Sequence, residues 1–189
     1  VLKRVIDGYA QVIEQRSRLL AERMQVLRRH GYRCGINVLA TIGHHNENLE
    51  NSLQGAFTRM TDIHGEICAG SFCPNDERLH RYIRQIYRSA ALADPDYIWI
   101  DDDVRLAGHM PIHLTCFCDH CLALFEKETG SRFTRLSLQK AMDEGPMEEK
   151  LRLRNAWLEH NRNTLAQLFR LIERTVHQLR PSMSLGFMT

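Results

Sequence analysis

Amphipathic helical segments alternate along this sequence with short apolar runs, and this order limits the folds open to the chain. The run Tyr97-Ile98-Trp99-Ile100 is the clearest strand candidate, and residues 34–42 and 184–189 have the composition of two more short strands. The sequence between these runs has helical periodicity and no hairpin signal. Strands separated by helices predict a parallel sheet with crossover helices, so we expect an α/β fold.

Turn and capping residues set the bounds of the expected helices. The boundary signals are Gly31 after the first helix, Asn75 or Asp76 before the second, Pro95 after it, Gly130 after a short helix over 122–128, Thr134 before another, and Pro181 after a long helix over 147–178. Residues 57–72 predict turn and irregular loop, with Asp62-Ile63-His64-Gly65 as the turn. Three good strands are too few for a closed eight-stranded barrel of about 250 residues, which leaves a small open sheet or a piece of a barrel.

Composition places the chain among ordinary globular domains. Of its 189 residues 43% are hydrophobic and 25% are charged, with a formal net charge of +2. This balance argues against a nucleic-acid partner, and no apolar run approaches the ~20 residues that a membrane span requires. A neutral or small polar partner fits better, and the sequence leaves a homo-oligomer open.

Three of the six cysteines fall in the segment Cys116-Phe117-Cys118-Asp119-His120-Cys121. Closely spaced thiolates at a turn before a helix can converge on one tetrahedral zinc ion, with sulfur at about 2.3 Å. A redox pair at Cys118 and Cys121 is the alternative. The clustering favours a metal over disulfides and predicts a reducing compartment, the cytoplasm.

A fourth zinc ligand has to come from another part of the chain. Cys73 is the best candidate, because it also lies in a loop before a helix and is followed by a rigid proline. Cys68, His113 and His120 remain alternatives. Four thiolates would leave no open coordination position, so we expect a structural zinc site.

Three carboxylates, Asp101, Asp102 and Asp103, directly follow the Tyr97–Ile100 run. The carboxyl ends of parallel strands form the ligand-binding edge of an α/β sheet, so chemistry is expected here. Alternation places Asp101 and Asp103 on one side of the strand and Asp102 on the other. Capping, pairing with Arg105 and binding of a hard cation are alternative roles.

Several ordered blocks along the chain match a known family. The blocks are Arg29-His30-Gly31 before the strand at Ile36, Asp62 and Gly65 followed by Cys73-Pro74 before a helix, Tyr97-Ile98-Trp99-Ile100-Asp101 before an acidic pair, Cys116-x-Cys118-x-x-Cys121 followed by Phe125, and Pro181 to Phe187-Met188. From about residue 20 to its end the chain resembles the catalytic domain of glycoside hydrolase family 42, the β-galactosidases, and relatives in the same clan. The resemblance implies that residues 1–189 are a fragment of a single domain, a truncated (β/α)8 TIM barrel.

The resemblance also implies roles for particular residues. It implies a structural zinc at Cys73, Cys116, Cys118 and Cys121, a carbohydrate substrate, and a general acid/base at Asp103, where the family has Glu. Asp102 takes the place of the family's Asn. We expect Asp102 and Asp101 to contact the sugar. His45 and Asn46, which follow the earlier strand over 34–42, are expected to bind sugar hydroxyls as well.

The family's nucleophile lies on a later strand that the chain does not contain. A retaining glycosidase needs two carboxyl groups about 5–5.5 Å apart, so the fragment is not expected to complete the cycle. A non-catalytic, zinc-stabilised carbohydrate-binding domain is the rival hypothesis, and the change from Asn-Glu to Asp-Asp favours it.

Overall fold

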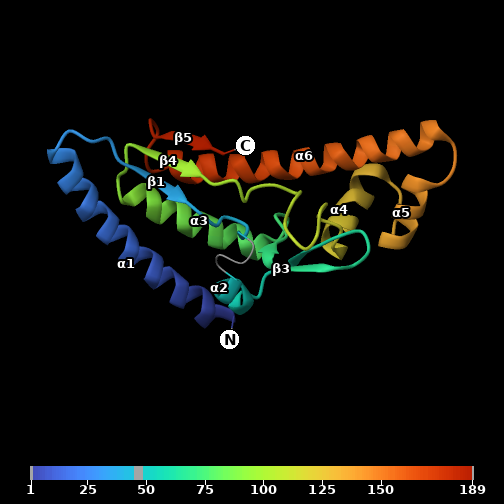
Figure 1. Ribbon diagram of the computed structural model, residues 1–189, viewed down its shortest axis with the longest axis horizontal. Helices are drawn as coiled ribbons and strands as arrows, with labels where there is room; N and C mark the ends of the chain where they lie inside the picture. The colour runs from blue at the N-terminus through green and yellow to red at the C-terminus, as the bar shows by residue number, and fades with distance from the viewer. Residues whose placement is uncertain (1, 45–48, 189) are drawn as a thin grey trace.

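A computed structural model describes residues 2–44 and 49–188 of the chain. Its helices and strands, in chain order, are α1 (Leu2–Arg29), β1 (Gly35–Val38), α2 (Leu49–Gln54), β2 (Arg59–Thr61), β3 (Ile67–Phe72), α3 (Glu77–Leu92), β4 (Tyr97–Ile100), α4 (Asp119–Thr129), α5 (Arg135–Asp143), α6 (Met147–His177) and β5 (Ser184–Phe187). The molecule is elongated, with the sheet of β1, β4 and β5 near one end and α4 and α5 at the other (Figure 1). The long helix α6 connects the two ends.

The main sheet has three parallel strands in the order β1-β4-β5. One of its faces is buried, because Ile36, Ile98 and Ile100 point from it into the core. Helix α3 lies against this side of the sheet and packs between α1 and α6, with Leu79, Ile83 and others fully buried (Figure 1). Burial of this apolar face is the main source of stability in the sheet.

The opposite face of the sheet exposes two aromatic residues of β4. Tyr97 and Trp99 are each 37% exposed, and their rings lie directly over Gly35 in β1 and Gly186 in β5. The ring of Trp99, although the residue lies within an apolar strand, is therefore on the accessible face. Glycine is required at both neighbouring positions, since an added Cβ would lie 2.1 Å from the Tyr97 ring and 2.2 Å from the Trp99 ring.

Residues 57–72, expected as irregular loop, form the antiparallel hairpin β2–β3 instead. The expected turn at Asp62 is present, and the Asp62 carboxylate accepts hydrogen bonds from the backbone N–H groups of His64 and Glu66. The hairpin forms a sheet of its own and leaves β4 directly beside β1.

The partial TIM barrel is thus a wrong prediction. The described strands form one open three-stranded parallel sheet and one separate two-stranded hairpin, and no barrel is closed. The physical reason is that β2 and β3 satisfy their backbone hydrogen bonds with each other and add no strand to the parallel sheet. Within the described residues, no helix is both long and apolar enough to cross a membrane.

Candidate metal centre and the acidic strand end

Four buried cysteines from two separate loops meet at one point. Cys73 follows β3, whereas Cys116, Cys118 and Cys121 lie before α4 and in its first turn. Their sulfur atoms all lie within 4.8 Å of one another, so the cluster could hold a metal ion. The four residues are those that the sequence selects.

The spacing of the sulfur atoms matches a tetrahedral thiolate site. The Sγ atom of Cys73 lies 3.4 Å from that of Cys121 and 3.6 Å from that of Cys118. Four sulfurs at about 2.3 Å from a central ion would be about 3.8 Å apart, whereas a disulfide needs about 2.05 Å. All six cysteines are free thiols, so the donor set is available to a metal.

The thiols in the cluster titrate together. The pKa of Cys118 lies far below its ordinary value, because of its hydrogen bonds with Cys116, Cys121 and Cys73. The pKa values of Cys73 and Cys121 are raised, first by their hydrogen bonds with Cys116 and also by burial. These hydrogen bonds favour ionisation of Cys118 and disfavour ionisation of Cys73 and Cys121. A bound divalent cation would favour the thiolate form of its ligands, because a metal binds deprotonated cysteine.

The backbone of the hairpin β2–β3 holds both cysteine loops. The N–H of Cys73 donates to the carbonyl of Thr58 at 2.7 Å, and the N–H of Phe117 donates to the carbonyl of Thr61 at 2.7 Å. The Phe117 ring also stacks on Trp157 of α6, with centroids 4.4 Å apart and an interplanar angle of 6°. Hairpin, loop and long helix together fix where the sulfur atoms point.

The alternative fourth ligands lie elsewhere. Cys68 is buried and its thiol donates to the carbonyl of Met110. Cys34, a further cysteine outside the cluster, is also buried. His113 and His120 are exposed and do not belong to the cluster. Among the described residues, the cluster therefore consists of four cysteines and includes no histidine.

The carboxyl group of Asp103 is sealed inside the fold. Its side chain has 0% exposure, and its Oδ2 atom accepts hydrogen bonds from the backbone N–H groups of Thr41, Ile42 and Gly43 at 2.6, 2.6 and 3.0 Å. Its Oδ1 atom has no hydrogen-bond partner among the described residues. Burial raises the pKa of Asp103 to about 7, against the three backbone hydrogen bonds, which lower it.

Asp103 therefore connects the loop after β4 to the loop after β1. In this arrangement its carboxyl group cannot contact a substrate, so the geometry lends no support to a general acid/base at this position. Gly43 is essential to the loop: its φ is +112°, and an added Cβ would lie 2.0 Å from the carbonyl oxygen of Gly70.

Asp102 is the accessible carboxylate of the strand end, with 40% of its side chain exposed. His44 Nε2 lies 2.8 Å from its Oδ1, and Arg105 pairs with its Oδ2. These two hydrogen bonds, from His44 first and then Arg105, hold the pKa of Asp102 below its ordinary value. Asp101 is buried, with its Oδ2 3.8 Å from the same nitrogen of His44.

His44 also belongs to the acidic strand end, although the sequence pattern favours its neighbours His45 and Asn46. It directly follows the first strand and its loop, which is the same signal that selected His45 and Asn46. These two residues lie outside the described part of the chain. The ring of His109 hydrogen bonds to Ser71 Oγ and to the carbonyl of Arg105.

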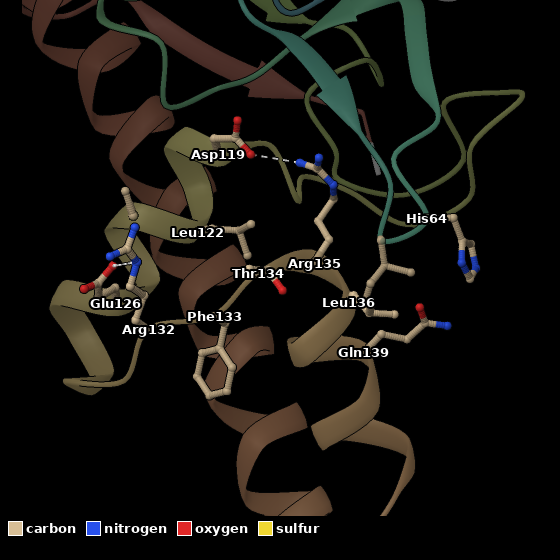
Figure 2. A pocket seen from close by; sticks show the side chains of 12 residues that line it. His64, Asp119, Leu122, Glu126, Arg132, Phe133, Thr134, Arg135, Leu136 and Gln139 are labelled. Atoms are coloured by element: carbon tan, nitrogen blue, oxygen red, sulfur yellow. Dashed lines mark hydrogen bonds and ion pairs between the residues drawn. The ribbon is translucent and has the colours of Figure 1, made fainter.

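A groove of about 700 Å³ lies beside the cysteine cluster, between the hairpin turn, α4 and α5 (Figure 2). Asp119 and Arg135 face each other across its upper part at 3.0 Å, and Leu122 and Phe133 supply apolar surface. None of the three strand-end carboxylates lines it. The cysteine cluster and the groove share α4, because Asp119 and Leu122, which line the groove, lie close to Cys121 in its first turn.

Comparison of the chain with family models, with curated proteins and with solved structures finds no match in any of the three. The resemblance to glycoside hydrolase family 42 therefore rests on the sequence blocks alone.

Proposed function

We propose that Cys73, Cys116, Cys118 and Cys121 bind one structural zinc ion that stabilises the junction of the hairpin, α4 and α6. The observation that carries this proposal is the convergence of four buried sulfur atoms within 4.8 Å. An all-sulfur tetrahedral site is typical of zinc or iron, and four protein ligands leave no position for a substrate. The role of the ion is then structural.

Metal analysis of the purified chain tests this proposal. We expect about one zinc per chain, a colourless protein, and a melting temperature that rises with free zinc, because a ligand that binds the folded state stabilises it. Cys118→Ser should lose both the zinc and this dependence. Cys34→Ser, at a cysteine outside the cluster, is the matched control and should keep both. A wild-type chain that contains no metal, or iron in place of zinc, would contradict the proposal.

A carbohydrate ligand at the strand end is the second proposal, and the exposure of Asp102 favours it. An ionised carboxylate flanked by His44 and Arg105 offers the acceptors and donors that bind sugar hydroxyls. The resemblance to the β-galactosidases suggests a galactoside. We propose carbohydrate binding rather than cleavage, because the carboxyl group of Asp103, the candidate general acid/base, is buried.

Titration with galactose and aryl β-galactosides, followed by NMR or calorimetry, tests the carbohydrate proposal. Asp102→Asn should weaken binding several-fold, and Asp143→Asn, at an exposed carboxylate of α5, should leave it unchanged. Release of the aryl group by the wild-type chain would extend the proposal to hydrolysis. Absence of binding at tens of millimolar sugar would contradict the carbohydrate proposal.

The six free thiols suit a reducing environment, and we propose a cytoplasmic location.

A further inference from the structure

Asn75 connects the cysteine cluster to helix α6. Its side-chain nitrogen Nδ2 lies 3.4 Å from the Sγ atom of Cys121 and 3.2 Å from the Oγ1 atom of Thr164. Cys121 and Thr164 are both buried, and Asn75 itself is partly buried. The amide thus donates one N–H to sulfur and the other to a hydroxyl of the long helix.

The capping arrangement of α3 leaves Asn75 available for this contact. The sequence offers Asn75 or Asp76 as the cap, and the structure uses Asp76, whose carboxylate accepts the N–H of Arg78. Asn75 is two residues from Cys73, in a turn closed by the hydrogen bond from the N–H of Asp76 to the carbonyl of Cys73. The loop before α3 therefore supplies both a candidate sulfur ligand, Cys73, and a hydrogen-bond donor, Asn75, to the sulfur of Cys121 in α4.

The charge of a loaded site explains what the donor would do. Four thiolates around one divalent cation leave an excess of two negative charges in a buried position, where ionised groups need hydrogen bonds. The backbone N–H of Cys121 donates a hydrogen bond to the sulfur of Cys118, and the Asn75 amide donates one to the sulfur of Cys121. Only the nitrogen end of the amide can do this, because its oxygen would repel a thiolate.

We propose that Asn75 is a positioning residue of the metal centre, whose N–H···S hydrogen bond to Cys121, braced by Thr164, slows release of the bound ion. The inference rests on the proposed metal site. Residues that hydrogen bond to metal ligands typically change metal affinity by about 10–100-fold when replaced. Asn75→Leu preserves size and removes both hydrogen bonds, so zinc transfer to a competing chromophoric chelator should be accelerated by about this factor.

Asn161→Leu is the matched control. Asn161 is another partly buried asparagine, and its amide joins α6 to the carbonyl of Thr115 beside the same loop without contacting sulfur. A merely structural role for Asn75 predicts equal acceleration in both variants. The positioning role predicts acceleration in Asn75→Leu and a rate close to wild type in Asn161→Leu.

Cobalt substitution supplies a second readout that folding stability does not change. A thiolate that loses a hydrogen bond becomes a better electron donor, so the sulfur-to-cobalt charge-transfer band should move to longer wavelength in Asn75→Leu and stay in place in Asn161→Leu. If the leucine variant does not fold, Asn75→Asp, which keeps the shape and puts a carboxylate against the thiolate, should show faster release. Wild-type release rate and an unshifted band in a folded Asn75 variant would overturn the inference alone. A wild-type chain without metal would overturn the proposed site itself.

Discussion

The Oδ2 atom of Asp103 lies 2.6 Å from the backbone nitrogen of Thr41, and this contact joins the ends of two neighbouring parallel strands. The same oxygen also receives the next two backbone N–H groups of the chain. Three consecutive amides around one carboxyl oxygen resemble the concave backbone sites that bind anions, here occupied by a carboxyl group of the protein itself. Asp103, to which the family resemblance assigns the general acid/base, thus stabilises the loop after β1.

Asp103→Asn should change how stability depends on pH. The folded-state pKa of about 7 exceeds the ordinary value of an aspartate, so the folded chain keeps a proton that the unfolded chain loses between about pH 4 and pH 7. The contribution of Asp103 to stability is therefore full below about pH 4 and falls as the pH rises to 7. Asparagine stays neutral throughout and keeps an acceptor for the three amides.

Urea unfolding of both proteins at several pH values measures this effect. The free energy of unfolding of the wild type, minus that of Asp103→Asn, should fall by roughly 3–4 kcal/mol between pH 4 and pH 8. Protonation of the cysteine cluster affects both proteins alike and cancels in the difference. A difference that is flat or rises over this range would show that the buried carboxylate is ionised at low pH.

Asp76→Asn should give a pH dependence of the opposite sign. Burial acts to raise the pKa of Asp76, but hydrogen bonds from Arg78 and the backbone N–H of Thr58 outweigh it and hold the pKa well below the ordinary value. Its stabilisation is present above about pH 4 and is lost as the pH falls through the folded-state pKa. At pH 7 we expect a loss of about 1–3 kcal/mol in the free energy of unfolding.

The measurement compares Asp76→Asn with wild type from pH 2 to pH 7. The two stabilities should converge toward the acid end and separate as the pH rises. Asp143→Asn, which removes an exposed carboxylate, serves as the control and should stay within about 0.5 kcal/mol of wild type. An equal loss at pH 2 and pH 7 would mean that the carboxylate charge contributes nothing.

Trp157→Ala should separate α6 from the cysteine loop. The indole stacks on Phe117, which lies between two of the cluster cysteines, and it meets the edge of Phe125 at 4.8 Å. Removing a buried tryptophan costs about 3–5 kcal/mol. Leu158→Ala, at the exposed neighbouring position, should change the free energy of unfolding by less than about 0.5 kcal/mol. Similar losses in both variants would show that the stack does not anchor the loop.

The sequence predicts the cysteine cluster and the parallel strands because each has a strong local signal. Three thiols within six residues need little tertiary information, and the run from Tyr97 to Ile100 has both the apolar content and the abrupt polar end of a strand. The hairpin is harder to predict. Arg59–Thr61 spans three residues, and Ile67–Phe72 is buried at its last three positions and so lacks the regular alternation of a half-buried strand.

Strand alternation predicts only part of the arrangement of Asp101, Asp102 and Asp103. Alternation correctly separates Asp101 and Asp103 from Asp102, because the first two are buried and the third is exposed. It cannot say which side meets solvent, since that depends on the distant amides of the loop after β1. The carboxylate of Asp103, to which the resemblance assigns the general acid/base, is therefore buried, and that of the neighbouring Asp102 is partly exposed.

Gly186→Ala tests whether the exposed ring of Trp99 is held by the glycine beneath it. An added Cβ would lie 2.2 Å from the Trp99 ring atom Cζ3, and Gly186 has no need of a left-handed backbone, so the clash with the ring is the reason for expecting destabilisation. Displacing a well-packed ring typically costs about 1–3 kcal/mol. In the Trp99→Leu background the same substitution should cost much less, because the smaller side chain can move away from the new methyl group.

A double-mutant cycle measured by urea unfolding separates this contact from other effects. The coupling free energy between positions 99 and 186 should be about 1 kcal/mol or more, with the double variant more stable than the sum of the single changes predicts. Gly35→Ala in the Trp99→Leu background is the control, because its clash is with Tyr97 and should persist. Additive single changes would mean that the Trp99 ring leaves its position over β5 without cost, and that this face of the sheet is not rigid.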